Sequence, residues 1–369
     1  MTPTTDPHPP VPYASLLAFA TDVFLARGVP GARARAAAQA LCYGDISGHD
    51  SHGLANLTRL YLPLLDSGRA VPGAEPRVLA DRGAAVLVDS RRSLGLVAAG
   101  EAMELAMARA RTHGVGMVSV RNATHFGCAG FHTARAARAG MVGMLAGNCG
   151  EQRIARPPGG ALPMLGTNPL SVAAPAGGRH PFVLDMSTTA APTGKIRAAA
   201  GGGRAIPEGW LEDSAGNAVV DPGAFDRGEA HLRWLGGAGS GVYKGYGLGL
   251  MVEVLGALVA GSGFGPAPRA LRGDGRPGGR DDDIGFLALA IAPGTLRPDG
   301  DVHRDSEALF GTLLACPPAR TGAEVRYPGW HEGERAARCR RHGVPVTAAL
   351  RDELRAVAHG LGLTAPEGM

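Results

Sequence analysis

Helical patterns open and close this sequence, and short strand-like runs fill its middle. Apolar residues recur at helical spacing over 13–27 and 31–46, and again over 346–361. Between these ends, the runs 84–90 and 115–120 are apolar, rich in valine and bordered by turn-forming residues. An order of helices, strands and helices predicts an α+β fold, in which both ends of the chain form a helical layer beside a strand-rich middle.

The same pattern predicts where the parts of the chain begin and end. Residues 1–12 are rich in proline and form a disordered tail. Segments 13–75 and 300–369 form the helical domain, and 76–299 form a strand-rich cofactor domain. Within the latter, the run PAPRALRGDGRPGGRDDD over 266–283 has few core-forming residues and predicts a flexible loop.

Charge and cysteine usage exclude several classes of protein. The formal net charge is only +4, and no basic stripe carries aromatic residues, so no nucleic-acid partner is expected. The five cysteines are an odd set without a CxxC pair, which favours a reduced, cytoplasmic protein over a disulfide framework or a zinc ribbon. The start, MTPTTDPHPPVPY, lacks the basic residues and apolar run of a signal peptide.

One apolar segment approaches the length of a membrane span. The run YGLGLMVEVLGALVAGSGFG, at 246–265, carries Glu253 as its single charge. Because the rest of the pattern is that of a soluble protein, we expect a buried helix in the core or at a subunit interface and no contact with a membrane.

The sequence does not support a Rossmann domain. The only G-x-G-x-x-G match is GDGRPG at 273–278, which follows no strand and has proline where a helix should begin. The phosphate-binding pattern GxxxxGK[ST] does not occur either. A nucleotide cofactor would therefore need a different binding fold.

The stretch GHDSHG, at 48–53, packs several chemically active side chains into one turn. A hydrolase triad is excluded because Asp50, Ser51 and His52 are sequential, and neighbouring side chains diverge. His49 and His52 lack the further partners of a metal site, so no metal is expected. The remaining hypothesis is that His52 is an acid/base catalyst, with a buried structural histidine as the alternative.

Six ordered blocks resemble one enzyme family. They are DSHGLANLTRLYLPLLDSG, RNATHFGCAGFHTARAARAGMVGMLAGN, PMLGTNPLSVAAP, FVLDMSTTAAPTGKI, IPEGWLEDSAGN and YKGYGLGLMVEVLGALVAGSGFG. Together they are similar to the malate/L-lactate dehydrogenase family of the second, non-Rossmann type. That family includes ureidoglycolate and sulfolactate dehydrogenases, diketogulonate reductase and piperideine-2-carboxylate (cyclic imine) reductases. The resemblance extends from about residue 13 to 362.

The resemblance implies a function and a set of site residues. Such enzymes are homodimers that use NAD or NADP and bind a small-molecule substrate between a helical and a strand-rich domain. The acid/base histidines fall on His52 and His125, although Thr124 stands where the family usually has asparagine. The positions implied for substrate binding are Ser51, Asn56, Arg59 and Asn168. The positions implied for cofactor binding are Asn148, Cys149, Asp185, Met186, Ser187, Thr188, Lys244, Gly245, Gly329 and His331.

One departure from the family bears on the substrate. Relatives that handle 2-keto acids usually carry arginine four residues after the first histidine, where this chain has Asn56, with Arg59 one turn further. The leading hypothesis is an NAD(P)-dependent oxidoreductase for a small 2-hydroxy acid-like alcohol and its ketone. The alternative is reduction of a cyclic imine, and a third hypothesis is a catalytically retired binding protein of the same fold.

Overall fold

The computed structural model describes residues 9–237, 241–297 and 301–369. The helices are α1 (Tyr13–Ala26), α2 (Gly31–Ser47), α3 (Leu62–Asp66), α4 (Gly95–His113), α5 (Ala129–Arg138), α6 (Thr193–Gly201), α7 (Gly223–Asp226), α8 (Val242–Glu253), α9 (Pro293–Leu296), α10 (Val302–Leu314), α11 (Trp330–His342) and α12 (Ala348–Leu361). Shorter turns are η1 (Asp50–His52), η2 (Leu57–Tyr61), η4 (Val254–Leu258) and η5 (Pro268–Arg272). The strands are β1 (Arg77–Asp81), β2 (Ala85–Asp89), β3 (Val115–Ala123), β4 (Val142–Gly147), β5 (Leu170–Ala174), β6 (Phe182–Met186), β7 (Leu211–Glu212), β8 (Ala218–Val219), β9 (His231–Leu232) and β10 (Ile284–Ile291).

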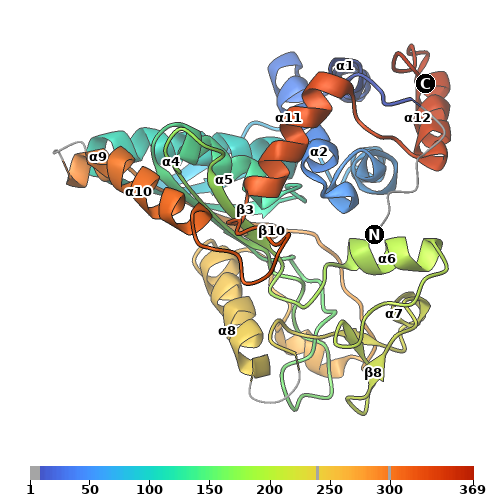
Figure 1. Ribbon diagram of the computed structural model, residues 1–369. Helices are drawn as coiled ribbons and strands as arrows, with labels where there is room; N and C mark the ends of the chain where they lie inside the picture. Colours follow the sequence, from blue (N-terminus) through green and yellow to red (C-terminus); the bar gives the residue numbers. More distant parts are fainter. Residues whose placement is uncertain (1–8, 238–240, 298–300) are drawn as a thin grey trace.

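Both ends of the chain form the helical layer. Helices α1, α2, α11 and α12 gather at one end of the molecule (Figure 1) and share a core that includes Phe24, Leu41 and Leu354. Val11 and Val344 exchange two backbone hydrogen bonds of 2.9 and 2.8 Å, which join the N-terminal segment to the loop before α12. The apolar stripes of these helices therefore find their partners in one another.

The strand-rich middle is a seven-stranded sheet in the order β1-β2-β3-β10-β4-β5-β6. In the described residues only β2 and β3 pair in parallel, and every other neighbouring pair of this sheet is antiparallel. A Rossmann sheet is parallel throughout its nucleotide-binding half. The predicted α+β class is therefore confirmed, and the sheet is not a Rossmann sheet.

Helices cover both faces of this sheet. Phe286, Ala288 and Ala290 of the central strand β10 point to one face, into the core that α4 and α5 complete. Val252 of α8 packs on the opposite face against Ala146, and η4 continues α8 across β4 and β10. Since successive side chains of a strand alternate, β10 contributes to both layers at once.

A third, smaller core lies beside the sheet. Strands β8, β7 and β9 pair in that order, and Ile196 of α6, Phe225 of α7 and Trp234 pack around them. In Figure 1 this part lies below the helical layer, with α6 between the two. These residues lie within 76–299, the range for which the sequence predicts one strand-rich domain.

Two regions differ in detail from the expected layout. Helix α10, which the predicted boundary at residue 300 assigned to the helical layer, packs on the sheet instead, because Phe310 stacks on Phe182 of β6 at 5.8 Å between ring centroids. The segment 266–283 contains the turn η5 and is joined to the rest of the chain by backbone hydrogen bonds of 2.7 and 2.8 Å between Arg153 and Gly278.

No helix in the described ranges combines the length and apolar character needed to cross a membrane. The apolar run 246–265 forms α8 and η4, which pack on the sheet as described above.

Candidate active site

A single helical turn, η1, presents His52. Helix α2 ends at Ser47, and the next residue, Gly48, has a left-handed φ of +86° that turns the chain into η1. Gly44 of α2 packs directly against this turn: a Cβ at Gly44 would lie 2.6 Å from the backbone nitrogen of Gly53 and 2.6 Å from the carbonyl carbon of His52. The histidine is thus held against the end of a buried helix.

Asp45 of α2 fixes the other side of the turn. Its carboxylate accepts a 2.9 Å hydrogen bond from the backbone N–H of Leu54, and Gly53 packs against the same group. Only 8% of Asp45 is exposed. Burial raises the pKa of this carboxyl to about 7, against the lowering effect of the hydrogen bond from Leu54.

We expect Asp45→Asn to stabilise the protein at neutral and alkaline pH. A folded-state pKa of about 7 exceeds the value of about 3.9 for an unfolded aspartate, so the folded chain retains the proton. This stability is fully present below about pH 4 and is lost as the pH rises through about 7. Asparagine keeps the acceptor for Leu54 without a charge, so the variant should gain on the order of 1–4 kcal/mol of unfolding free energy at about pH 8. Urea unfolding measures the gain, and a gain as large at about pH 4.5 would contradict the explanation.

His125 lies just beyond the end of β3, and two donors fix its tautomer. The backbone N–H of Gly127 donates to Nδ1 of His125 at 3.1 Å, and the hydroxyl of the fully buried Tyr61 lies 2.9 Å from the same nitrogen. Because Nδ1 accepts, the neutral ring carries its proton on Nε2. Burial also lowers the pKa of His125. The ring is therefore a neutral N–H donor at Nε2.

Thr124, the residue before His125, forms two hydrogen bonds with backbone groups near the start of α4. Its hydroxyl accepts a 2.9 Å hydrogen bond from the N–H of Gly95 at the start of α4 and donates to the carbonyl of Ser93 at 3.2 Å. The residue that departs from the family motif thus connects the segment carrying His125 to α4.

The structure brings the two predicted catalytic histidines together. The rings of His52 and His125 lie 5.6 Å apart between centroids, with an interplanar angle of 33°. Burial, followed by the neighbouring His125 and His49, lowers the pKa of His52 to about 3. Both rings are therefore neutral at pH 7.

His52 differs from His125 in its freedom to change tautomer. Its Nδ1 lies 2.9 Å from the hydroxyl of Ser51, a group that can donate or accept. Nε2 of His52 can accordingly be a proton acceptor or an N–H donor, whereas Nε2 of His125 is fixed as a donor. One ring suits proton transfer and the other suits orientation of an oxygen atom.

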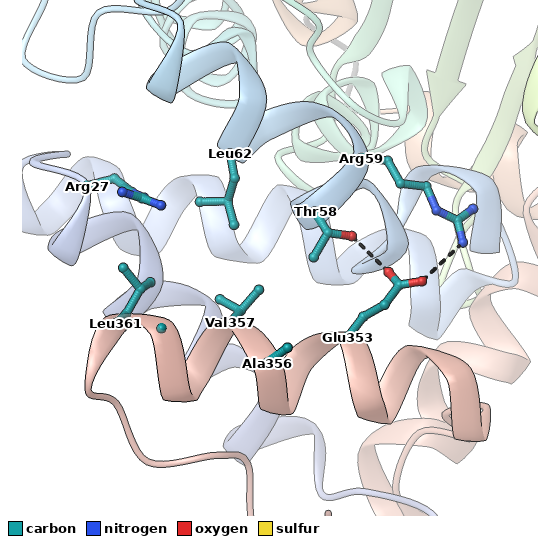
Figure 2. Close-up of a pocket in the computed structure, with 9 residues that line it drawn as sticks. Arg27, Thr58, Arg59, Leu62, Glu353, Ala356, Val357 and Leu361 are labelled. Carbon is teal, nitrogen blue, oxygen red and sulfur yellow. Dashed lines mark hydrogen bonds and ion pairs between the residues drawn. The ribbon is translucent and has the colours of Figure 1, made fainter.

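The polar residues that follow His52 are engaged within the protein. The amide of Asn56 donates to the carbonyl of Ser51 at 2.9 Å and so closes the turn. Arg59 points elsewhere, as Figure 2 shows: it forms a 3.5 Å ion pair with Glu353 of α12, which also accepts a 2.8 Å hydrogen bond from Thr58. Thr58, Arg59 and Glu353 line a groove of 590 Å³ whose lining includes neither histidine. The structure thus does not bring Arg59 to the histidine pair.

Asn148 and Asn168 meet at a buried carboxylate. Glu253 of α8 accepts from the side-chain amide of Asn168 at 2.6 Å and from that of Asn148 at 3.3 Å. The oxygen of Asn148 accepts from the backbone N–H groups of Gly150 and Gly285, at 3.1 and 2.9 Å. Asn168 gives its second amide hydrogen to a backbone carbonyl, and its own Oδ1 is buried without a partner in the described residues.

Residues 185–188 lie close to the segment that contains Thr167 and Asn168. Thr188 donates to the carbonyls of Thr167 and Asn168 at 3.0 and 3.1 Å, and Cys149 lies 3.4 Å from the hydroxyl of Thr167. Asp185, at the end of β6, accepts a 2.7 Å hydrogen bond from the N–H of Gly130 at the start of α5, and burial raises the pKa of its carboxyl.

The chain that follows residues 185–188 leads to the turn η1, which carries His52. Met186 ends β6, and Ser187 donates to the carbonyl of Thr189 at 3.0 Å. A few residues on, a Cβ at Gly194 would lie 2.5 Å from the Cβ of Ser51. Helix α6, which follows the predicted cofactor segment in the chain, therefore packs against the turn carrying His52.

The other predicted cofactor residues lie on separate helices. Lys244 is exposed on the first turn of α8 without an ion-pair partner among the described residues, and Gly245 packs on the backbone of Leu235. Gly329 begins α11 with φ +95°, and His331 is exposed on the same helix. Figure 1 shows α8 and α11 on different sides of the sheet.

Some residues near the site were not singled out from the sequence. Tyr61 occupies an apolar position of a helical pattern, and Asp45 lies in an alanine-rich helix, so neither gave a signal. Glu253 did give one, as the lone charge in the run 246–265. In the described ranges, no cluster of three or more histidine, cysteine, aspartate or glutamate residues is placed to hold a metal ion.

Two neutral histidines with different tautomeric freedom are groups that can transfer a proton at neutral pH. The sheet beside them is not a Rossmann sheet, so acid/base chemistry at this pair would take place on a fold of a non-Rossmann class.

Comparison with known proteins identifies that class. The model of the malate/L-lactate dehydrogenase family matches residues 11–355. A malate dehydrogenase of Pyrococcus horikoshii is 37% identical over 253 residues, which cover 68% of this chain and 69% of the relative. A (2R)-3-sulfolactate dehydrogenase (NADP(+)) of Chromohalobacter salexigens is 35% identical over 331 residues, 90% of this chain and 92% of the relative.

Further comparisons agree. A Delta(1)-pyrroline-2-carboxylate/Delta(1)-piperideine-2-carboxylate reductase of Pseudomonas putida is 30% identical over 88% of this chain and 92% of its own. The structure of a malate dehydrogenase from Entamoeba histolytica superimposes with a TM-score of 0.89 at 25% identity, over 97% of this chain and 99% of that one. The chain belongs to the malate/L-lactate dehydrogenase family, so the resemblance in its motifs is confirmed. Members are NAD(P)-dependent dehydrogenases and reductases, and this chain is accordingly an oxidoreductase.

Proposed function

We propose that this protein interconverts a small 2-hydroxy acid-like alcohol and its ketone by hydride transfer, with NAD or NADP as the hydride carrier. The observation that carries the proposal is the histidine pair at 5.6 Å, in which one tautomer is fixed and the other is free. The cofactor supplies or accepts the hydride at the substrate carbon. The chain's own residues orient the substrate oxygen and move its proton.

His125 and His52 divide this work. The Nε2–H of His125 donates to the substrate oxygen and holds it, while Nε2 of His52 takes the hydroxyl proton during oxidation of the alcohol. In the reverse direction His52 must first be protonated and then give that proton to the oxygen. A bound anionic substrate favours this protonation, because a negative charge nearby raises the pKa of an imidazole.

The residues around Asn168 fit the nicotinamide end of a dinucleotide. Oδ1 of Asn168 is a buried acceptor without a partner in the described residues, and the carboxamide of nicotinamide carries N–H donors. We place the same end of the cofactor beside Cys149 and the segment Asp185, Met186, Ser187 and Thr188. Asn148, whose amide is fully used inside the protein, would act by holding Asn168 in place through Glu253.

The more distant cofactor contacts stay predictions. Lys244 is exposed and would offer its ammonium group to a phosphate, next to the backbone of Gly245. Gly329 and His331 would lie toward the adenosine end.

Reduction of a cyclic imine is the alternative. Asn56 does not separate the two reactions, because the cyclic imines named for the relative also carry a carboxylate. The neutral amide at this position is bonded to Ser51 and offers no charged partner for a carboxylate. One of the relatives is a cyclic imine reductase. In this reaction His52 would protonate the ring nitrogen instead of an oxygen.

Steady-state assays with NADH and NADPH test the proposal. The substrates are pyruvate, oxaloacetate, longer 2-oxo acids and piperideine-2-carboxylate, and we expect turnover of at least one of them. A fluorescence titration with each dinucleotide accompanies the assays. Binding without turnover of any oxo acid or imine would overturn the proposed reaction, and no binding of either dinucleotide would favour a retired binding protein.

We also propose a homodimer formed through the outer face of α8 and η4. Met251, Val254 and Leu258 are 37%, 46% and 73% exposed, a run of large apolar side chains that a partner would cover. Light scattering at micromolar concentration should give twice the mass of one chain. Leu258→Glu should shift the protein toward monomers, whereas Leu296→Glu, at a leucine that is 66% exposed on α9, should not. A fully active monomer would contradict the proposal.

A cytoplasmic location is part of the same proposal. All five cysteines are free thiols, three of them buried, as in proteins of a reducing compartment.

A further inference from the structure

His132 of α5 is a completely buried histidine that binds the backbone next to His125. Its Nε2 lies 2.9 Å from the carbonyl oxygen of Phe126. A carbonyl oxygen can only accept a hydrogen bond, so Nε2 must be the donor. Burial lowers the pKa of His132 to about 4. The ring is therefore neutral at pH 7 and carries its single proton on Nε2.

The other ring nitrogen of His132 makes no hydrogen bond. Its Nδ1 is buried without a partner among the described residues, on the side of Gly100 of α4, where an added Cβ would lie 3.7 Å from it. A buried acceptor that is left unpaired costs free energy. An apolar side chain would avoid this cost, so the one contact that needs a histidine here is the hydrogen bond to Phe126.

The carbonyl of Phe126 and the N–H of Gly127 belong to one peptide group. In a planar trans peptide these two groups point in opposite directions. His132 binds the oxygen, and the N–H of the same peptide donates to Nδ1 of His125 at 3.1 Å. A chain of two hydrogen bonds thus connects Nε2 of His132 to Nδ1 of His125. Hydrogen bonds in such a chain strengthen one another.

Packing fixes the residues on each side of this peptide but not the direction of its plane. The ring of Phe126 packs against that of Phe286 at 5.7 Å between centroids. Gly127 has a left-handed φ of +74°. Because glycine adopts positive and negative φ about equally well, the peptide before it can rotate at little cost. The hydrogen bond from His132 selects the one orientation in which the N–H faces His125.

We propose that His132 is a positioning residue that fixes the tautomer of His125 through the Phe126–Gly127 peptide. The inference rests on the proposed function, in which the Nε2–H of His125 holds the substrate oxygen. If the peptide rotated, its carbonyl would face Nδ1 of His125, and the proton of that ring would move to Nδ1. Nε2 would then have no hydrogen to donate to the oxygen of a ketone.

The hydroxyl of Tyr61 does not replace this peptide. It lies 2.9 Å from the same Nδ1 of His125 and donates to it in the present arrangement. A hydroxyl can equally accept a hydrogen bond from a protonated Nδ1, so it fits either tautomer. The backbone N–H of Gly127 can only donate, and it therefore decides which tautomer is present.

Nuclear magnetic resonance of the protein with ¹⁵N-labelled histidine tests the inference without any substrate. Couplings between the ring nitrogens and ring protons show which nitrogen carries the proton. In the wild type we expect His132 and His125 to be neutral at pH 7, each with its proton on Nε2. A proton on Nδ1 of His132 would overturn the inference.

The variant His132→Leu should move the proton of His125. Leucine is apolar and offers no donor, so the ratio of the Nδ1–H form to the Nε2–H form of His125 should rise about fivefold, the effect of one hydrogen bond. Turnover of a 2-oxo acid should fall about three- to tenfold in kcat, while KM for NADH and NADPH changes less than about twofold. The variant His132→Gln keeps an N–H donor at the end of its side chain and should restore the wild-type tautomer and most of the turnover.

The matched control is Thr133→Val, at the next residue of α5. The buried hydroxyl of Thr133 lies 2.8 Å from that of Ser171, so this variant also loses a buried hydrogen bond in the same helix. It should leave the tautomer of His125 unchanged. An equal shift in Thr133→Val, no shift in His132→Leu, or a shifted tautomer in His132→Gln would each overturn the inference.

The wild-type spectrum and His132→Gln decide the question even if His132→Leu does not fold. If no 2-oxo acid or cyclic imine reacts with the wild type, the proposed function fails, whereas the tautomer of His125 still tests the role of His132.

Discussion

Replacing His52 by alanine should lower turnover at least about a hundredfold, while the affinity for the dinucleotide changes by less than about twofold. His52 has a pKa lowered to about 3, so it is a neutral base in the free enzyme, and its Nε2 is free to change protonation. The methyl group of alanine can neither take nor give a proton. His125 cannot substitute, because the N–H of Gly127 and the hydroxyl of Tyr61 occupy its Nδ1 and fix its proton on Nε2.

The matched control is His49→Ala, in the same loop and three residues earlier. If the two histidines acted together, for instance on a metal, both variants should lose activity to a similar extent. We expect the His49 variant to stay within about threefold of the wild type. Near-normal turnover in a folded His52→Ala variant would remove His52 from the mechanism.

Ordered motifs made part of this site predictable. The blocks DSHG and THFG predicted His52 and His125 as the catalytic pair, although 73 positions in the sequence separate them, and the structure brings their rings to 5.6 Å. The alternation of helical and strand patterns likewise predicted the α+β class, because each pattern follows from which side of an element faces the core.

Other features depend on contacts that no local pattern contains. Arg69 donates a 2.7 Å hydrogen bond to Asp281, although the two residues are 212 positions apart and neither lies in a periodic segment. The apolar stripe of α10 indicated a helix but not its partner, which is Phe182 on β6 and not the helical layer. Helix α5 was not predicted as a helix, because its buried side chains are small or polar, such as Ala134, His132 and Thr133, and resemble those of a loop.

For Asn56, the sequence showed the departure from the arginine of relatives, but it did not show the hydrogen bond that the side chain makes. Its departure from arginine was visible in the sequence. That its amide closes the η1 turn by donating to Ser51 became evident only in the structure. The position thus contributes to the shape of the turn as well as to the chemistry of the site.

The variant Asn56→Arg should improve the use of pyruvate and oxaloacetate. In the wild type, an anion at this position loses hydration and gains only a neutral amide that is already bonded to Ser51. A guanidinium offers a charge-assisted pair, worth about 1–3 kcal/mol, or roughly a 5- to 150-fold gain in kcat/KM.

Steady-state kinetics of wild type and variant with NADH and NADPH measure the gain, and Asn56→Gln is the matched control. Glutamine lengthens the side chain and keeps the amide without adding charge, so it separates the effect of charge from a disturbance of the η1 turn. Efficient wild-type turnover of either acid would mean that another cation already holds the carboxylate. Arg59 could hold it only by leaving its ion pair with Glu353. That result would contradict the hypothesis that Asn56 moves the substrate preference away from simple 2-oxo acids.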